Sequence, residues 1–277
     1  MLAIGQTVTL EILRTAPMGL ILGDDDGEVL LPTRYVPKDV EPGESVEVFL
    51  YTDSEDRPIA TTEKPLAQAD EFACLRVASV TKAGAFLDWG LPKDLLLPFA
   101  YQVHRVSPEE RVVVRVLLDE VSQRPVATTK FQRYLDLPPE DLREGQGIEW
   151  MVFEETDLGS KAIVNGRFEG LFYRAVGEPG LKRGDSGSGY VQRIRDDGKI
   201  DLSRTPMGLA GIDRARDALL EALHQAGGKL ELGDRSDPDQ IRSAVGLSKK
   251  AFKRAAGALY RERKVLVADH SIELIEK

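Results

Sequence analysis

Basic and aromatic side chains are interleaved along residues 161–199 of this 277-residue chain. Cationic side chains neutralise phosphates and exposed rings stack on bases, so the combination is typical of surfaces that bind single-stranded nucleic acid. We therefore predict an RNA-binding surface in this segment. Its candidate contact residues are Lys161, Arg167, Phe168, Tyr173, Arg174, Tyr190, Arg193, Arg195 and Lys199.

A second basic segment lies near the C-terminus, where residues 248–264 hold seven Lys and Arg residues and one acid, Glu262. A 3.6-residue period predicts a helix there. It has few side chains that could form hydrogen bonds with base edges, so we expect it to bind nucleic acid with little sequence preference. Its predicted inward face comprises Phe252, Ala255, Ala256, Leu259 and Tyr260. Its candidate phosphate-binding residues are Lys249, Lys250, Lys253, Arg254 and Arg261.

The charge of the chain is distributed unevenly. The formal net charge is −9, and residues 1–70 account for it with 5 basic and 14 acidic side chains. Phosphates would be repelled from this segment, so we expect it to be structural or to contact a protein partner.

No set of residues has the types and spacing of a catalytic or metal site. Residues 184–187 (Gly-Asp-Ser-Gly) resemble the nucleophile loop of trypsin-like proteases, but His104, His224 and His270 lie in no recognisable base motif. The acidic run 24–27 lacks the alternating ligands and the terminal Glu of a calcium loop. We expect a protein that is not an enzyme and uses no cofactor or metal.

A block that recurs three times predicts how the first candidate surface is positioned. Arg57-Pro58-Ile59-Ala60-Thr61-Thr62 returns as Arg124-Pro125-Val126-Ala127-Thr128-Thr129 and, more loosely, as residues 198–203. A hairpin glycine precedes each copy, and the intervals from Gly19 to Ile59, Gly84 to Val126 and Gly159 to Ile200 are 40, 42 and 41 residues. A fixed period indicates one structural unit used repeatedly.

Each unit reads as five short antiparallel strands, which describes an OB-type barrel. In the second copy we expect strands at 72–80, 84–89, 94–98, 111–118 and 124–129. Phe86 follows the hairpin glycine by two residues and is a further candidate RNA contact, provided that the strand register places it outside the barrel. The predicted barrels span residues 1–65, 66–138 and 139–208.

Beyond residue 208 the apolar period changes from two to 3.6 residues. Three helices and a two-stranded hairpin at 265–267 and 272–274 predict a winged-helix domain over residues 209–277. The expected fold class is mostly β with an α+β C-terminal domain.

Several motifs carry a resemblance to a known family. They are residues 84–88 (Gly-Ala-Phe-Leu-Asp), Gly184-Asp185 and residues 198–203 (Gly-Lys-Ile-Asp-Leu-Ser). They resemble the S-one domain, an RNA-binding OB module. In order and spacing the whole chain is similar to the conserved virulence factor B family, which implies tandem S-one-like barrels, a C-terminal winged helix, RNA binding and an influence on gene expression.

Two other functions are compatible with these patterns. The winged helix could bind duplex DNA as a transcription regulator whose barrels sense a ligand, or the acidic first barrel could make the chain a protein-interaction scaffold. The single cysteine, Cys74, fits a reducing cytoplasm, and no apolar run approaches the about 20 residues that cross a bilayer. We expect a cytoplasmic protein whose main partner is single-stranded RNA.

Overall fold

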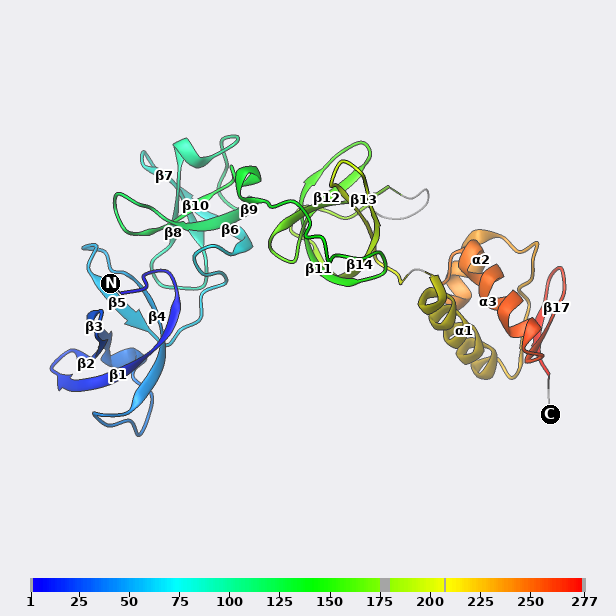
Figure 1. The fold of residues 1–277 in the computed structure, drawn as a ribbon, viewed down its shortest axis with the longest axis horizontal. Coiled ribbons are helices and arrows are strands. Elements are labelled where there is room, and N and C mark those ends of the chain that lie inside the picture. The colour runs from blue at the N-terminus through cyan, green and yellow to red at the C-terminus, as the bar shows by residue number, and fades with distance from the viewer. Residues whose placement is uncertain (1, 175–179, 207, 276–277) are drawn as a thin grey trace. The chain divides into compact units, whose positions relative to one another are not determined.

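The computed structural model describes residues 2–174, 180–206 and 208–275. Three closed five-stranded barrels precede three α-helices and a small sheet (Figure 1), which confirms the predicted fold class. The chain forms two compact units, one of residues up to 137 with 150–187, the other of residues 138–149 with 188 onwards. The strands of the third barrel belong in part to each unit.

The first barrel closes in the order β1-β2-β3-β5-β4. Strands β3 and β5 are parallel, and the other described pairs are antiparallel. Alternate residues of each strand point into a core that includes Ile12, Leu22, Leu31 and Leu50. Its elements are β1 (Thr7–Ala16), β2 (Gly19–Asp24), β3 (Gly27–Pro32), the 3-10 helix η1 (Thr33–Tyr35), β4 (Ser45–Thr52) and β5 (Pro58–Thr61).

The second barrel repeats this topology, with the order β10-β8-β7-β6-β9. The strands begin and end within one residue of the predicted positions. Its elements are β6 (Phe72–Val80), β7 (Gly84–Asp88), β8 (Leu95–Pro98), η2 (Phe99–Tyr101), β9 (Arg111–Leu118) and β10 (Pro125–Thr128).

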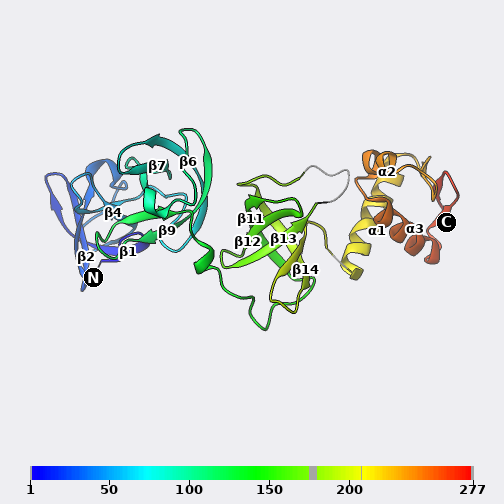
Figure 2. The same ribbon diagram turned by 90° about the horizontal axis from the view of Figure 1, so that it is seen from above.

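The third barrel, whose strands β11, β12, β13 and β14 are labelled in Figure 2, again has the same order, β11-β12-β13-β15-β14. The 3-10 helix η3 (Gln132–Tyr134) lies between the second and third barrels in the sequence. The strands are β11 (Gly147–Glu155), β12 (Gly159–Val164), β13 (Phe168–Tyr173), β14 (Ser186–Ile194) and β15 (Ile200–Ser203).

The hairpin glycine has the same role in all three barrels. Gly19, Gly84 and Gly159 have φ angles of +146°, +152° and +152°, which L side chains rarely adopt. A Cβ atom at each position would lie 1.9, 2.4 and 1.9 Å from a carbonyl oxygen of the paired strand. The repeat therefore recurs at this position because only glycine lets the two strands approach so closely.

The repeated threonine pair also has an equivalent role in the first two barrels. Thr61 and Thr128 each accept a hydrogen bond at 3.0 Å from the backbone N–H two residues later. The Thr62 hydroxyl donates to the carbonyl oxygen of Tyr35 at 2.8 Å. The Thr129 hydroxyl donates to the carbonyl oxygen of Tyr101 at 3.3 Å. Each pair thus ties the last strand of its barrel to the 3-10 helix that follows the third strand.

Aromatic side chains join the first two barrels into one core. Phe49 of β4 meets Trp89 edge to face, with ring centroids 5.6 Å apart. Phe49, Tyr51 and Trp89 are all less than 5% exposed. Such pairs contribute about 0.5–1.5 kcal/mol beyond the area that they bury.

Capping residues define the helices of the C-terminal domain. The Asp237 carboxylate accepts from the N–H of Asp239 at the start of α2, and Gly246 ends that helix in the left-handed conformation. Ser248 caps α3 by accepting from the N–H of Ala251. The elements are α1 (Gly208–Gln225), β16 (Lys229–Leu230), α2 (Pro238–Val245), α3 (Lys249–Arg261), β17 (Val265–Val267) and β18 (Ile272–Leu274).

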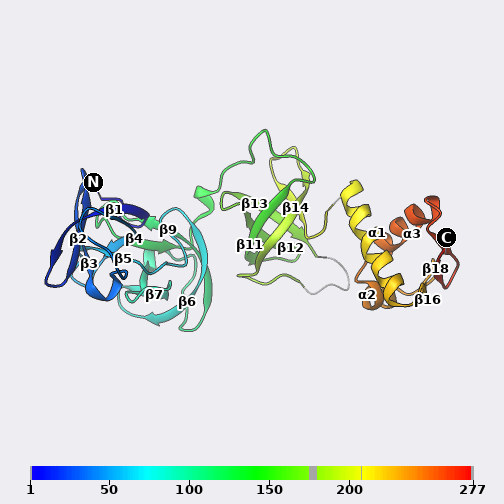
Figure 3. The same cartoon turned by 90° about the horizontal axis from the view of Figure 1, so that it is seen from below.

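Helices α1 and α3 pack together, and the three-stranded sheet lies beside them (Figure 3). The sheet order is β16-β18-β17, so β16 adds a strand to the predicted hairpin. Phe252, Ala255, Ala256 and Leu259 are buried in the shared core, as predicted. The prediction for Tyr260 is wrong: its side chain is 57% exposed, because it lies at the edge of the apolar face of α3.

Candidate nucleic-acid interface

Strand β12 carries the first candidate residue of the third barrel, Lys161. Lys161 Nζ lies 2.8 Å from Glu154 Oε2 on the neighbouring strand β11. The hydrogen bond to this carboxylate raises the pKa of Lys161. Lys161 is therefore cationic at neutral pH, but a carboxylate already neutralises it.

The two residues at the β12–β13 turn have different surroundings. Arg167 is exposed, and its Nη2 atom lies 2.9 Å from Asp136 Oδ2. The prediction that Phe168 offers its ring to a base is wrong, because Phe168 is only 5% exposed. Its side chain points inward with Phe172, since the residues of β13 alternate between the core and the outer face. Arg167 covers the Phe168 ring, with its guanidinium 5.5 Å from the ring centroid.

The end of β13 presents two accessible candidates. Tyr173 is 49% exposed. The Arg174 guanidinium donates to the carbonyl oxygen of Thr156 at 3.2 Å. Both side chains remain at the surface, where a nucleic acid could reach them.

Strand β14 and the turn that follows it carry four further candidates, all in the second unit. Arg195 Nη2 lies 2.6 Å from Asp201 Oδ1, and both side chains are largely buried. Lys199 Nζ lies 3.4 Å from Asp197 Oδ2. Tyr190 is half-buried, and Arg193 is exposed. Carboxylates therefore neutralise two of the three cations at this position.

Strand β7 of the second barrel confirms the register predicted for Phe86. Ala85 and Leu87 are fully buried, so Phe86 between them points out of the barrel and is half-buried. The second barrel has a further aromatic contact that the sequence does not predict. The Arg105 guanidinium stacks on Phe99, 3.8 Å from the ring centroid. The two residues come from η2 and an irregular loop, where no periodic pattern could indicate the contact.

Helix α3 presents a cationic face. Lys250, Lys253, Arg254 and Arg261 are exposed on one side, and Lys249 is half-buried. Lys253 Nζ lies 3.7 Å from Asp234 Oδ2. Within the described chain, no carboxylate pairs with Lys249, Lys250, Arg254 or Arg261. This face is therefore less neutralised than the third barrel.

The sequences that could suggest catalysis or calcium binding form turns. The Asp185 carboxylate accepts from the N–H of Lys182 at 2.8 Å, just before β14. The Asp24 carboxylate accepts from the N–H of Asp26 at 2.8 Å, between β2 and β3. The parts of the chain that the structure describes contain no group of three or more His, Cys, Asp or Glu placed to hold a metal.

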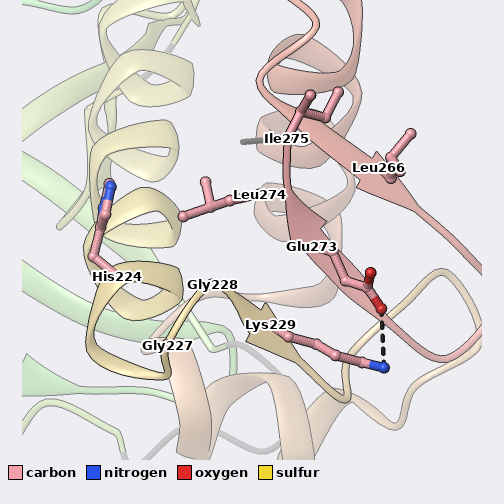
Figure 4. A pocket seen from close by; sticks show the side chains of 8 residues that line it. All are labelled: His224, Gly227, Gly228, Lys229, Leu266, Glu273, Leu274 and Ile275. Atoms are coloured by element: carbon pink, nitrogen blue, oxygen red, sulfur yellow. Dashed lines mark ion pairs between the residues drawn. The ribbon is translucent and has the colours of Figure 1, made fainter. Parts of the chain in front are cut away.

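A hollow of about 660 Å³ lies between the end of α1 and the small sheet (Figure 4). Lys229 of β16 and Glu273 of β18 point toward each other there, with Nζ 2.9 Å from Oε1. Leu266, Leu274 and Ile275 supply apolar lining. The hollow thus holds one ion pair beside aliphatic side chains, together with the imidazole of His224, whose Nδ1 lies 2.7 Å from the carbonyl oxygen of Leu220. None of the described helices is both long and apolar enough to cross a membrane.

Two domain families match the chain. An S1 (S-one) domain model matches residues 4–63, which form the first barrel. A CvfB-like winged helix domain model matches residues 217–274, from within α1 to the end of β18. The family models thus match the two ends of the chain.

Similar proteins span nearly the whole chain. An uncharacterized protein YitL of Bacillus subtilis is 27% identical over 282 residues, covering 94% of this chain and 90% of its own. A conserved virulence factor B of Staphylococcus epidermidis is 22% identical over 267 residues, covering 93% and 90%. A solved multidomain protein with nucleic acid binding domains from Streptococcus pneumoniae is 22% identical, covers 98% of both chains and gives a TM-score of 0.45.

Residues 4–63 therefore match an S1 domain, residues 217–274 match a CvfB-like winged helix domain, and the chain is similar to conserved virulence factor B proteins over most of its length.

Proposed function

We propose that this protein binds single-stranded RNA with little sequence preference and acts in the post-transcriptional control of gene expression in the cytoplasm. It does so without catalysing a reaction. The observation that carries the proposal is the cationic face of α3, on which Lys250, Arg254 and Arg261 lack carboxylate partners among the described residues. Such a face attracts a polyanion by releasing its counterions.

The barrels supply the second element of this function, which is stacking. OB barrels bind single strands on the face of their second and third strands, where aromatic rings stack on bases. In the second barrel, Phe86 lies on that face, and the stacked Phe99–Arg105 pair follows the third strand. Tyr173 is the exposed ring at the corresponding end of β13. We assign the phosphates to α3 and base stacking to these rings.

The first barrel has the opposite character. Its residue at the position of Phe86 is Ile21, and its segment of the chain is strongly acidic. We therefore assign no RNA contact to it and retain the alternative that it contacts a protein. Binding of duplex DNA by α3 is the competing function, since the third helix of a winged-helix domain is placed to enter a major groove.

A salt titration tests the proposal. For the full chain and a labelled single-stranded RNA, the logarithm of the binding constant should fall linearly with the logarithm of the salt concentration. In a Lys250→Ala/Arg254→Ala variant the slope should become shallower by about 0.7 for each phosphate that the variant no longer neutralises. Lys38→Ala removes an exposed cation from the first barrel and should leave the slope unchanged.

Three results of this experiment would overturn the proposal. They are binding that does not depend on salt, an unchanged slope in the α3 variant, and tighter binding of duplex DNA than of single-stranded RNA in direct competition. The last result would favour the transcription regulator.

A further inference from the structure

A glycine occupies the centre of the cationic face of α3. Gly257 is exposed, and a Cβ atom built on it would have nothing within 4 Å. The cationic residues Lys250, Lys253 and Arg254 precede it by seven, four and three positions. Arg261 follows by four. Residues at these spacings share one side of a helix with Gly257.

This glycine weakens the helix that contains it. Glycine in a helix interior costs about 0.8–1.0 kcal/mol relative to alanine, and α3 has alanine at Ala251, Ala255, Ala256 and Ala258. An alanine at position 257 would therefore fit the helix better and would meet no obstacle.

The usual structural reasons for a helical glycine do not apply to Gly257. The helix continues without interruption to Arg261, and Glu262 is its C-cap, so Gly257 neither ends nor caps it. A Cβ built at the position would have no side chain of the described residues within 4 Å, apart from its two chain neighbours. The missing side chain leaves the helix backbone open here to close approach by another backbone.

Neighbouring side chains identify the chemistry of that approaching backbone. Arg261 Nε donates to the carbonyl oxygen of Gly257 at 3.2 Å, which holds the guanidinium beside the glycine. Tyr260, 57% exposed, presents its ring one helical turn further along. Cations around a bare helix backbone, next to an exposed ring, suit a sugar–phosphate chain whose bases can stack.

We propose that Gly257 is the point at which the RNA strand crosses α3 in direct contact with the helix backbone. This inference rests on the proposed function and adds the position and closeness of the contact. The absent side chain admits the strand, Arg261 and Arg254 hold its phosphates, and Tyr260 faces a neighbouring base.

The test depends on opposite effects of one substitution. In the full chain, Gly257→Ala should slow hydrogen exchange of the α3 amides by about fivefold, because alanine favours the helix. The same variant should bind single-stranded RNA about fivefold more weakly or worse, as expected for disturbing a closely packed contact. Gly257→Gln should weaken binding further. A substitution that merely improved the helix would leave affinity unchanged.

A matched control is available at Gly147, an exposed glycine of β11 with nothing within 4 Å of an added Cβ. Gly147→Ala should leave RNA affinity unchanged. The inference is overturned if both Gly257 variants bind RNA like the unaltered protein. It is also overturned if RNA affinity falls only in variants whose α3 amides exchange hydrogen faster, because the loss would then come from a weakened helix. A loss confined to duplex DNA would also overturn it.

The Lys250→Ala/Arg254→Ala variant separates the two proposals. If that variant loses affinity while Gly257→Ala and Gly257→Gln do not, the proposed function stands and only the close contact at Gly257 is wrong. If that variant binds normally, the role of α3 in the proposed function fails as well.

Discussion

Lys161 Nζ and Glu154 Oε2 lie 2.8 Å apart on the paired strands β12 and β11. Both side chains are partly exposed, so the ion pair contributes only about 0–1 kcal/mol to stability. Its larger consequence is electrostatic. The Glu154 carboxylate neutralises the positive charge of Lys161, which an RNA phosphate would otherwise pair with.

Removing this carboxylate should therefore strengthen RNA binding. We expect Glu154→Gln to raise the affinity for single-stranded RNA about two- to fivefold, the scale of one surface ion pair. Fluorescence anisotropy at fixed salt measures the effect. Glu47→Gln, which changes the net charge equally on the first barrel, is the control. Equal affinities for the Glu154 variant and the unaltered protein would place RNA away from this part of the third barrel.

The outer face of β7 gives a second prediction. Phe86→Ala should weaken RNA binding by about 5- to 150-fold if one base stacks on the ring, since stacking contributes about 1–3 kcal/mol per base. Ile21→Ala, at the equivalent position of the first barrel, should leave binding unchanged. Circular dichroism checks that both variants remain folded. Similar affinities for the two variants would contradict a role for the Phe86 ring.

The hairpin glycines predict a large effect on stability. Gly84→Ala places a Cβ 2.4 Å from the carbonyl oxygen of Leu97 at a φ of +152°. We expect the free energy of unfolding to fall by about 1–3 kcal/mol or more. Urea denaturation followed by tryptophan fluorescence measures it, with Gly147→Ala expected within about 0.5 kcal/mol of the unaltered protein. An unchanged free energy of unfolding in Gly84→Ala would show that the hairpin backbone can shift to accept the Cβ.

Tyr51 predicts how stability depends on alkaline pH. Burial, followed by the nearby Tyr35, raises the pKa of Tyr51 to about 12. The folded state thus holds the phenol proton more tightly than the unfolded chain, whose tyrosines titrate near about 10. This contribution to stability is complete below the unfolded pKa and is lost as the pH rises through the folded pKa.

Difference absorbance during an alkaline titration measures this ionisation. Comparison with Tyr51→Phe identifies the signal of the Tyr51 phenolate, which should develop only near pH 12. A signal that develops near pH ~10 would mean that the core shared by the first two barrels opens to solvent.

Much of the fold follows from local features of the sequence. The hairpin glycine recurs because all three barrels need the same close backbone approach, and the threonine pair recurs because the first two barrels share the same hydrogen bonds. The strand positions of the second barrel follow from its alternating apolar residues. For β13 the sequence does not show which residues face the core, because apolar residues occur on both faces of the strand. Only Glu169 indicates the outward face.

The candidate site was less predictable because its electrostatics depend on distant residues. Asp136 neutralises Arg167 across 31 positions of the chain, and Asp234 approaches Lys253 from outside α3. A count of basic residues therefore overestimates the free cations of the third barrel. Helix α3 was easier to interpret, because its basic residues lie on a single helical face and most have no carboxylate partner among the described residues.

The closing devices of the barrels have a consequence for engineering. Each hairpin glycine meets a carbonyl of its own barrel, and each threonine pair bonds to its own 3-10 helix. Neither device uses the outward-facing side chains of the strands, so we expect those side chains to be replaceable while the scaffold is retained. Transplanting the outward-facing residues of β7 and β8, such as Phe86 and Leu96, onto β2 and β3 would test whether the first barrel then binds RNA.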